Sequence, residues 1–155
     1  LRILKAVDDV NDDQKKVLFR KIRTHFNGDL KGKTFGILGL SFKPNTDDIR
    51  EAPALYVIDA LIDAGATVTA FDPEGMPNVK RQIGDKIGYV ENQYDALANA
   101  DALIIATEWA EFRTPDFDKI GAALKNKAIF DGRNLFEVAQ VRGLGYHYES
   151  VGRPL

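Results

Sequence analysis

The stretch TFGILGL, residues 34–40, decides the fold class of this 155-residue chain. A continuous, mostly apolar run of this length is typical of a strand buried on both faces, as in parallel sheets. A polar stretch follows at 41–52. Pro53 then suits the first turn of a helix, and residues 54–64 carry apolar side chains at helical spacing. We therefore predict a buried strand, a long polar loop and a helix, in that order.

The rest of the chain repeats this alternation. Further strands are predicted at 67–71, 88–90, 102–106, 128–131 and 146–150, and short helices at 77–83, 94–99, 117–124 and 135–141. Strands that alternate with helices imply βαβ units, right-handed crossovers and a parallel sheet. The predicted fold class is α/β: a Rossmann-like, doubly wound, mainly parallel sheet of about six strands.

A long helix is predicted before the sheet, over residues 1–26, because this segment is charge-rich, lacks Gly and Pro, and stops at Asn27-Gly28. Its apolar positions form two stripes at helical spacing, interrupted by amides. One stripe is Leu4, Val7, Asn11, Gln14, Leu18 and Ile22, and the other is Ile3, Ala6, Val10 and Val17. Because isolated helices are marginal, we expect a connecting or dimerisation helix; an ordinary surface helix of the same domain is the alternative.

Composition excludes several classes of function. The chain has no cysteine, which rules out disulfides, thiolate metal sites and a cysteine nucleophile within it. The two histidines, His25 and His147, lie far apart in the sequence, so no histidine metal signature is present. A net charge of −2 argues against nucleic acid or an anionic membrane as a partner. With no membrane-length apolar run and no signal-peptide pattern, we expect a soluble, cytoplasmic domain.

Ligands of such sheets bind beyond the carboxyl ends of the strands, but the sequence there matches none of the common ligand-binding motifs. Gly36 and Gly39 have the wrong spacing for the dinucleotide fingerprint, and Asp72 lies too far along the chain to be its ribose-binding acid. We therefore favour a turn or helix-capping role for Asp72, and close packing against a helix for Gly36. The loop matches neither the nucleophile elbow nor the Walker A motif.

Cations remain as the candidate ligand-binding groups. Lys43 and Arg50 follow the first strand, and Arg133 follows the fifth. Such side chains neutralise a phosphate or diphosphate with charge-assisted hydrogen bonds. Phe42 offers an aromatic face, although core packing is the commoner role. Arg50 also has Asp47, Asp48 and Glu51 as possible ion-pair partners. We expect those carboxylates to cap the helix that begins near Pro53, and Trp109 to be a packing residue. The residues alone thus indicate an anionic, nucleotide-like ligand.

The stretch 36–53, GILGLSFKPNTDDIREAP, closely resembles the C-terminal domain of UDP-glucose 6-dehydrogenases. Four later segments recur in the same order in that family: FDP at 71–73, TEWAEF at 107–112, FDGRN at 130–134 and SVGRP at 150–154. Residues 6–15 resemble the end of the family's central dimerisation helix. The resemblance covers essentially the whole chain. GDP-mannose dehydrogenases share this domain organisation, but the sequence KPNT at 43–46 is more similar to that of the UDP-glucose 6-dehydrogenases.

The resemblance implies specific roles. Residues 1–28 would be the end of the dimerisation helix, and residues 29–155 would be the UDP-sugar-binding domain. The whole enzyme would be a homodimer that uses NAD to oxidise UDP-glucose, or a related UDP-sugar, to the uronate in two hydride transfers. Lys43 and Phe42 resemble residues that contact the UDP-sugar, and Arg133 resembles the arginine that reaches its diphosphate or sugar. Arg50 resembles the arginine that crosses the cleft to the NAD phosphates.

One departure limits activity. The family's thiol nucleophile and NAD fingerprint belong to sequence N-terminal to residue 1, so the chain alone is expected to be inactive, as a fragment of the dehydrogenase. The alternatives are a non-catalytic nucleotide-binding or dimerisation module, or a dehydrogenase of another nucleotide sugar. An upstream glycine-rich βαβ unit with a cysteine motif would identify the enzyme.

Overall fold

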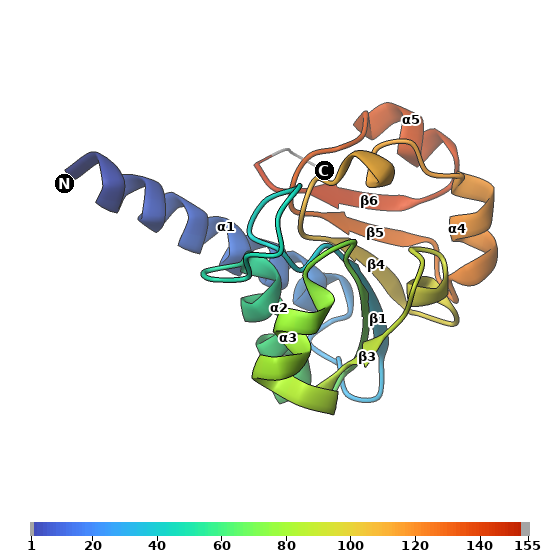
Figure 1. Cartoon of the computed structure of the whole chain (residues 1–155). Helices are drawn as coiled ribbons and strands as arrows, with labels where there is room; N and C mark the ends of the chain where they lie inside the picture. The colour runs from blue at the N-terminus through green and yellow to red at the C-terminus, as the bar shows by residue number, and fades with distance from the viewer. Residues whose placement is uncertain (1, 153–155) are drawn as a thin grey trace.

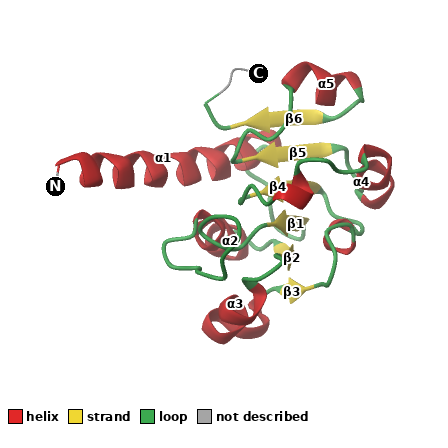
Figure 2. Cartoon of the chain, turned by 45° about the horizontal axis from the view of Figure 1, so that its top comes forward, coloured by secondary structure: helices red, strands yellow, loops and turns green. Residues whose placement is uncertain are grey.

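A computed structural model describes the backbone of residues 2–152 and the side chains of residues 14–152. Within that part, six parallel strands form one sheet with helices on both faces (Figures 1 and 2). The strands are β1 (Thr34–Leu38), β2 (Thr67–Phe71), β3 (Gly88–Tyr89), β4 (Ala102–Ile105), β5 (Ala128–Asp131) and β6 (His147–Ser150). The helices are α1 (Arg2–His25), α2 (Pro53–Asp63), α3 (Met76–Ile83), α4 (Phe117–Ala123) and α5 (Val138–Gly143), with 3₁₀ turns η1 (Gly84–Lys86), η2 (Asp95–Leu97) and η3 (Ala110–Phe112).

The strand order is β3-β2-β1-β4-β5-β6, and every neighbouring pair is parallel. The chain first winds outward from β1 through β2 to β3, then crosses back to β4 and winds the other way. This order is that of the doubly wound dinucleotide-binding fold, and it leaves a switch point between the carboxyl ends of β1 and β4. The predicted fold class is confirmed.

Three elements differ from their predicted bounds by more than one residue. β1 ends at Leu38 because Gly39 turns the chain with a φ of +96°, and a Cβ there would lie 2.6 Å from the Thr107 backbone nitrogen. The helix expected at 94–99 is only the turn η2. The last helix starts at Val138 rather than 135, because its N-cap Glu137 has an extended backbone with φ −73° and ψ 124°.

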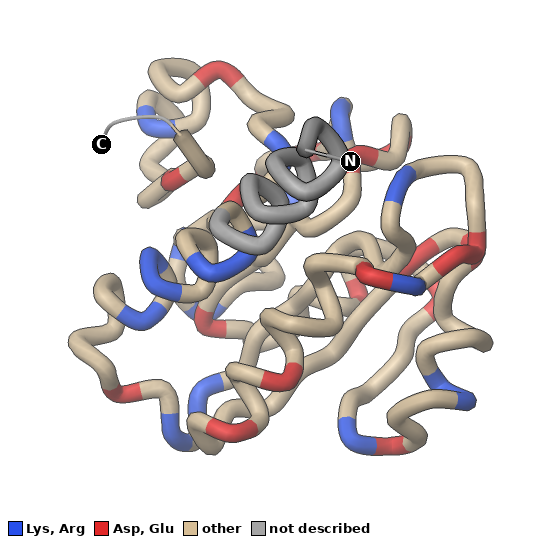
Figure 3. Tube along the Cα trace, turned by 90° about the vertical axis from the view of Figure 1, so that its left-hand side faces the viewer, with Lys and Arg blue, Asp and Glu red and all other residues tan. Residues whose placement is uncertain are grey.

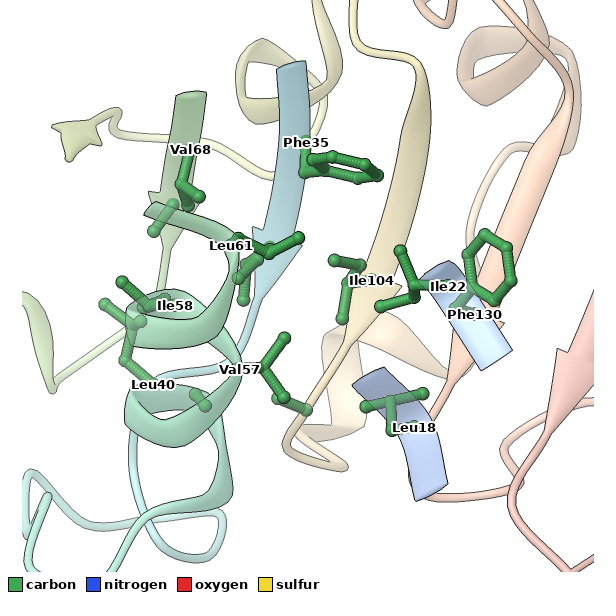
Figure 4. Packing of buried hydrophobic residues seen from close by; sticks show 14 of the residues in the cluster. Leu18, Ile22, Phe35, Leu40, Val57, Ile58, Leu61, Val68, Ile104 and Phe130 are labelled. Carbon is green, nitrogen blue, oxygen red and sulfur yellow. The ribbon is translucent and has the colours of Figure 1, made fainter. Parts of the chain in front are cut away.

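Buried side chains form one cluster on each face of the sheet. The first lies beneath α1 and α2, and Figure 4 shows Leu18 and Ile22 of α1 reaching Ile104 and Phe130 of the sheet. Leu18 and Ile22 are 3% and 0% exposed. The end of α1 is therefore built into the core. The side chains of the predicted stripes at residues 3–11 lie outside those described.

Gly36 in β1 allows a close approach from the other face. A Cβ at this position would lie 2.8 Å from Leu97 Cδ2 and closer still to the Ala96 carbonyl oxygen of η2. The predicted close packing is confirmed, with a 3₁₀ turn as the neighbour. Among the described residues, no helix is both long and apolar enough to cross a membrane.

Candidate functional site

A pocket opens at the carboxyl ends of β1, β4 and β5, beside the switch point. It is lined by segments far apart in the sequence: Gln14, Lys15 and Leu18 of α1, Phe42 and Pro53 after β1, Ala106 after β4, and Gly132 and Arg133 after β5. Figure 3 shows basic residues continuing along the described part of α1, from which Lys15 comes. The position is the one that the fold predicts for a ligand.

Arg133 joins the two sides of this pocket. Its Nη2 donates to the Phe42 carbonyl oxygen at 3.1 Å, and its Nε lies 2.9 Å from Glu108 Oε2. The side chains of Arg133 and Glu108 are about one quarter exposed, at 24% and 25%. The guanidinium is thus fixed by two partners, yet solvent still reaches part of it. A guanidinium carries five N–H donors, so donors remain for an incoming anion.

The loop that presents Arg133 is held by Asp131, the last residue of β5. One oxygen of this fully buried carboxylate accepts from the Arg133 N–H at 2.8 Å. The other accepts from the Leu135 N–H and from the Tyr148 hydroxyl, each at 2.7 Å. Backbone donors at a strand's end are otherwise unpaired, and a buried unpaired donor is costly. Asp131 therefore fixes the turn that points Arg133 toward the switch point.

Asp72, directly after β2, holds the loop on the other side. Its buried carboxylate accepts from the backbone N–H groups of Leu40 and Ser41 at 2.7 and 3.0 Å, and from those of Glu74 and Gly75 at 2.8 and 2.7 Å. Two side chains complete the set: Ser41 Oγ at 3.2 Å and Trp109 Nε1 at 3.1 Å. The interpretation of Asp72 as a turn acid is confirmed, as is the packing role of Trp109, which is 7% exposed.

Lys43 is exposed and follows Phe42, the residue that Arg133 contacts, so both cations lie on the same rim of the sheet. Phe42 is 38% exposed, more than a core residue would be. The Thr107 hydroxyl donates to the Ser41 carbonyl at 2.6 Å and so ties the start of this loop to the end of β4.

Arg50 is 86% exposed and pairs with Asp48, through Nη2 at 2.9 Å and Nε at 3.0 Å. The hydrogen bonds from Arg50 lower the pKa of the Asp48 carboxyl to about 2. Of the three acids considered, the structure thus selects Asp48. The expected cap of α2 is wrong: its N-cap is Ala52, with no side-chain hydrogen bond, and the Asp48 carboxylate instead accepts from the Arg50 N–H at 3.0 Å.

Sequence reasoning missed three contributors: Glu108, Asp131 and the extent of the Asp72 network. A usable signal was present, since each is an acid at or just beyond the carboxyl end of a predicted strand. Asp72 and Asp131 satisfy loop N–H groups there, and Glu108 pairs with Arg133. Phe42 and Arg133 are brought together in the pocket, whereas Lys43, the residue after Phe42, is not among the residues that line it. Arg50 belongs to the same loop and is held by its own acid.

The fold and the cationic pocket at its switch point define a nucleotide-binding α/β domain. Residues 36–138 match the family described as the UDP-glucose/GDP-mannose dehydrogenase family, UDP binding domain, and the chain belongs to that family.

Related proteins are similar to this chain over nearly its full length. A UDP-glucose 6-dehydrogenase of Rhizobium meliloti is 44% identical over 154 residues, covering 99% of this chain and 35% of the relative. One from Haloferax volcanii is 44% identical over 152 residues, covering 97% and 33%. The solved UDP-glucose dehydrogenase of Pyrobaculum islandicum superposes with a TM-score of 0.75 at 32% identity, covering 96% of this chain and 31% of that one. The chain spans about a third of the length of these relatives.

Proposed function

We propose that this chain is the UDP-sugar-binding part of an NAD-dependent nucleotide-sugar 6-dehydrogenase, with UDP-glucose or a related UDP-sugar as the substrate. The observation that carries the proposal is the contact between Arg133 and the Phe42 carbonyl, which gathers Phe42, Lys43 and Arg133 at one rim. Family membership and the names of the relatives support the choice of a UDP-sugar.

Lys43 and Arg133 would bind the diphosphate. Arg133 is already oriented by Glu108 and Phe42, so little side-chain freedom is lost when a phosphate arrives. Its guanidinium geometry suits bidentate bonds to phosphate oxygens, while the Lys43 ammonium acts as a mobile point charge. The exposed ring of Phe42 would lie near the uridine.

Arg50 would serve the cofactor. Its guanidinium is 86% exposed and its partner Asp48 is 37% exposed, so a phosphate of NAD can replace Asp48 at small cost, because exposed ion pairs contribute little to stability. NAD⁺ supplies the hydride acceptor of such a reaction. The bulk of its site, and the thiol nucleophile, would come from other parts of the enzyme, since this chain contains no cysteine.

The same proposal assigns residues 1–28 to the end of a dimerisation helix and 29–155 to the binding domain. The apolar face of α1 at Leu18 and Ile22 is already covered by the sheet. A dimer contact would therefore use the earlier part of the helix, and truncation of the earlier part should then abolish self-association in sedimentation experiments.

Calorimetric titration with UDP tests the binding roles. We expect binding that weakens as salt rises from 50 to 200 mM, and that falls by about 10- to 100-fold in Arg133→Ala, as the loss of a charge-assisted bond predicts. Lys43→Ala should weaken binding by a smaller factor. Arg113→Ala is the matched control: Arg113 is exposed beyond β4, outside the pocket. Unchanged affinity in both Lys43→Ala and Arg133→Ala would exclude these roles.

A further inference from the structure

His25 and His147, the only two histidines of the chain, meet in the folded structure. His25 is the last residue of α1, and His147 is the first residue of β6. Their rings stack with centroids 4.1 Å apart. Their separation in the sequence gave no sign of a histidine pair, because only the packing of α1 across the sheet brings them together.

A carboxylate completes the group. Glu149 lies two residues after His147 on the same strand, so both side chains are on the face of the sheet that α1 covers. His147 Nε2 is 2.8 Å from Glu149 Oε2. Glu149 is buried, with its side chain 10% exposed, whereas that of His147 is 38% exposed. One ligand atom from each of the three residues lies within 4.8 Å of the others.

We infer that His25, His147 and Glu149 form a binding site for a divalent first-row transition-metal ion, with Zn²⁺ the best fit. Two imidazoles and one carboxylate are ligands that Zn²⁺ prefers, and three protein ligands leave a fourth position for water. This site is separate from the pocket at the carboxyl ends of the strands, and it does not depend on the proposed function.

The geometry requires only small side-chain movements. Zn–N and Zn–O bonds of about 2.0–2.2 Å place tetrahedral ligand atoms roughly 3.3–3.5 Å apart. The His147–Glu149 pair is already closer than that, so the ion would enter between them and the His25 ring. The His147 side chain is 38% exposed, so its ring has room to rotate toward the ion, while the Glu149 side chain is 10% exposed and largely enclosed.

The surroundings favour a cation. His25 ends α1, and the carboxyl end of a helix dipole carries partial negative charge. The Phe130 ring lies 5.5 Å from the His25 ring and 5.9 Å from that of His147, which gives the cluster an apolar floor and strengthens charge interactions there. A bound ion would link the end of α1 to β6, and so fasten the helix to the sheet.

Co²⁺, which takes zinc sites and absorbs visibly, is the probe. Titrating the untagged chain should give visible absorption that saturates at one ion per chain and is abolished by Zn²⁺. Glu149→Gln and His147→Phe, which keep the side-chain shapes, should each weaken binding by about tenfold or more, since even the groups that support metal ligands are worth that much. With Zn²⁺ at about 100 times its Kd, Tm should rise by ~5–10 °C.

Lys21→Ala is the control. Lys21 also ties α1 to β6, through the Ser150 carbonyl at 3.1 Å, but it is not a ligand. Its loss should leave Co²⁺ affinity unchanged or higher. Far-UV circular dichroism of each variant separates lost ligands from lost structure. Absence of saturable binding, or Co²⁺ affinities of Glu149→Gln and His147→Phe that both equal that of the unchanged chain, would overturn the inference and indicate an adventitious ion only.

Discussion

Replacing Asp72 with asparagine tests whether one buried carboxylate organises both loops of the pocket. Asp72 accepts six hydrogen bonds, three at each oxygen. The amide keeps one acceptor oxygen, and its NH₂ group then faces three donors. Three lost bonds at about 1–1.5 kcal/mol each predict a destabilisation of roughly 3–4 kcal/mol. For a chain of this size, that lowers Tm by about 6–16 °C.

Urea unfolding followed by circular dichroism measures this loss, with the urea dependence compared between variants to check that the folded state is the same. Asp116→Asn is the control, since Asp116 is an exposed acid that accepts two backbone N–H bonds at the start of α4. Asparagine is also a good N-cap, so this change should cost less than about 0.5 kcal/mol. A cost for Asp72→Asn as small as that would refute the role assigned to the network. UDP affinity should fall together with stability, because the network holds the loop that carries Lys43.

Two further perturbations test the packing and the surface. Gly36→Ala should destabilise the chain by ~1–3 kcal/mol, because the added Cβ would meet the Ala96 carbonyl. Gly143→Ala is the control, since open space surrounds Gly143, and it should raise stability by about 0.5 kcal/mol. Equal effects of the two substitutions in urea unfolding would argue against the close approach of η2 to β1. In a ¹³C NMR pH titration, the pKa of Asp48 should lie near 2 and return toward 3.8 in Arg50→Ala. Since the folded-state pKa is the lower one, the contribution of this pair is present above pH 3.8 and is lost as the pH falls toward 2. An Asp48 carboxyl that titrates near 3.8 with Arg50 present would disprove the pairing.

Much of the fold follows from apolar patterning. The strand predictions at 67–71 and 128–131 coincide with β2 and β5, because continuous apolar runs between turn residues mark buried strands. The rim bearing Lys43 and Arg133 was also predictable, since parallel strands place all their carboxyl ends on one edge.

Specific pairings were not predictable. The Arg133 bond to the Phe42 carbonyl joins residues 91 positions apart, and it depends on how Asp131 folds its own turn. His25 meets His147 only because Leu18 and Ile22 seat α1 across the sheet. Each of these contacts is set by tertiary packing, which local spacing does not encode.

We propose that uridine diphosphate binds at the rim shared by β1, β4 and β5, and residue-resolved NMR during a UDP titration can locate the bound nucleotide. We expect the largest amide shifts at residues 41–43, 106–108 and 132–134. Shifts concentrated at the amino ends of the strands, near Lys33 or Lys127, with the rim amides unmoved, would contradict it.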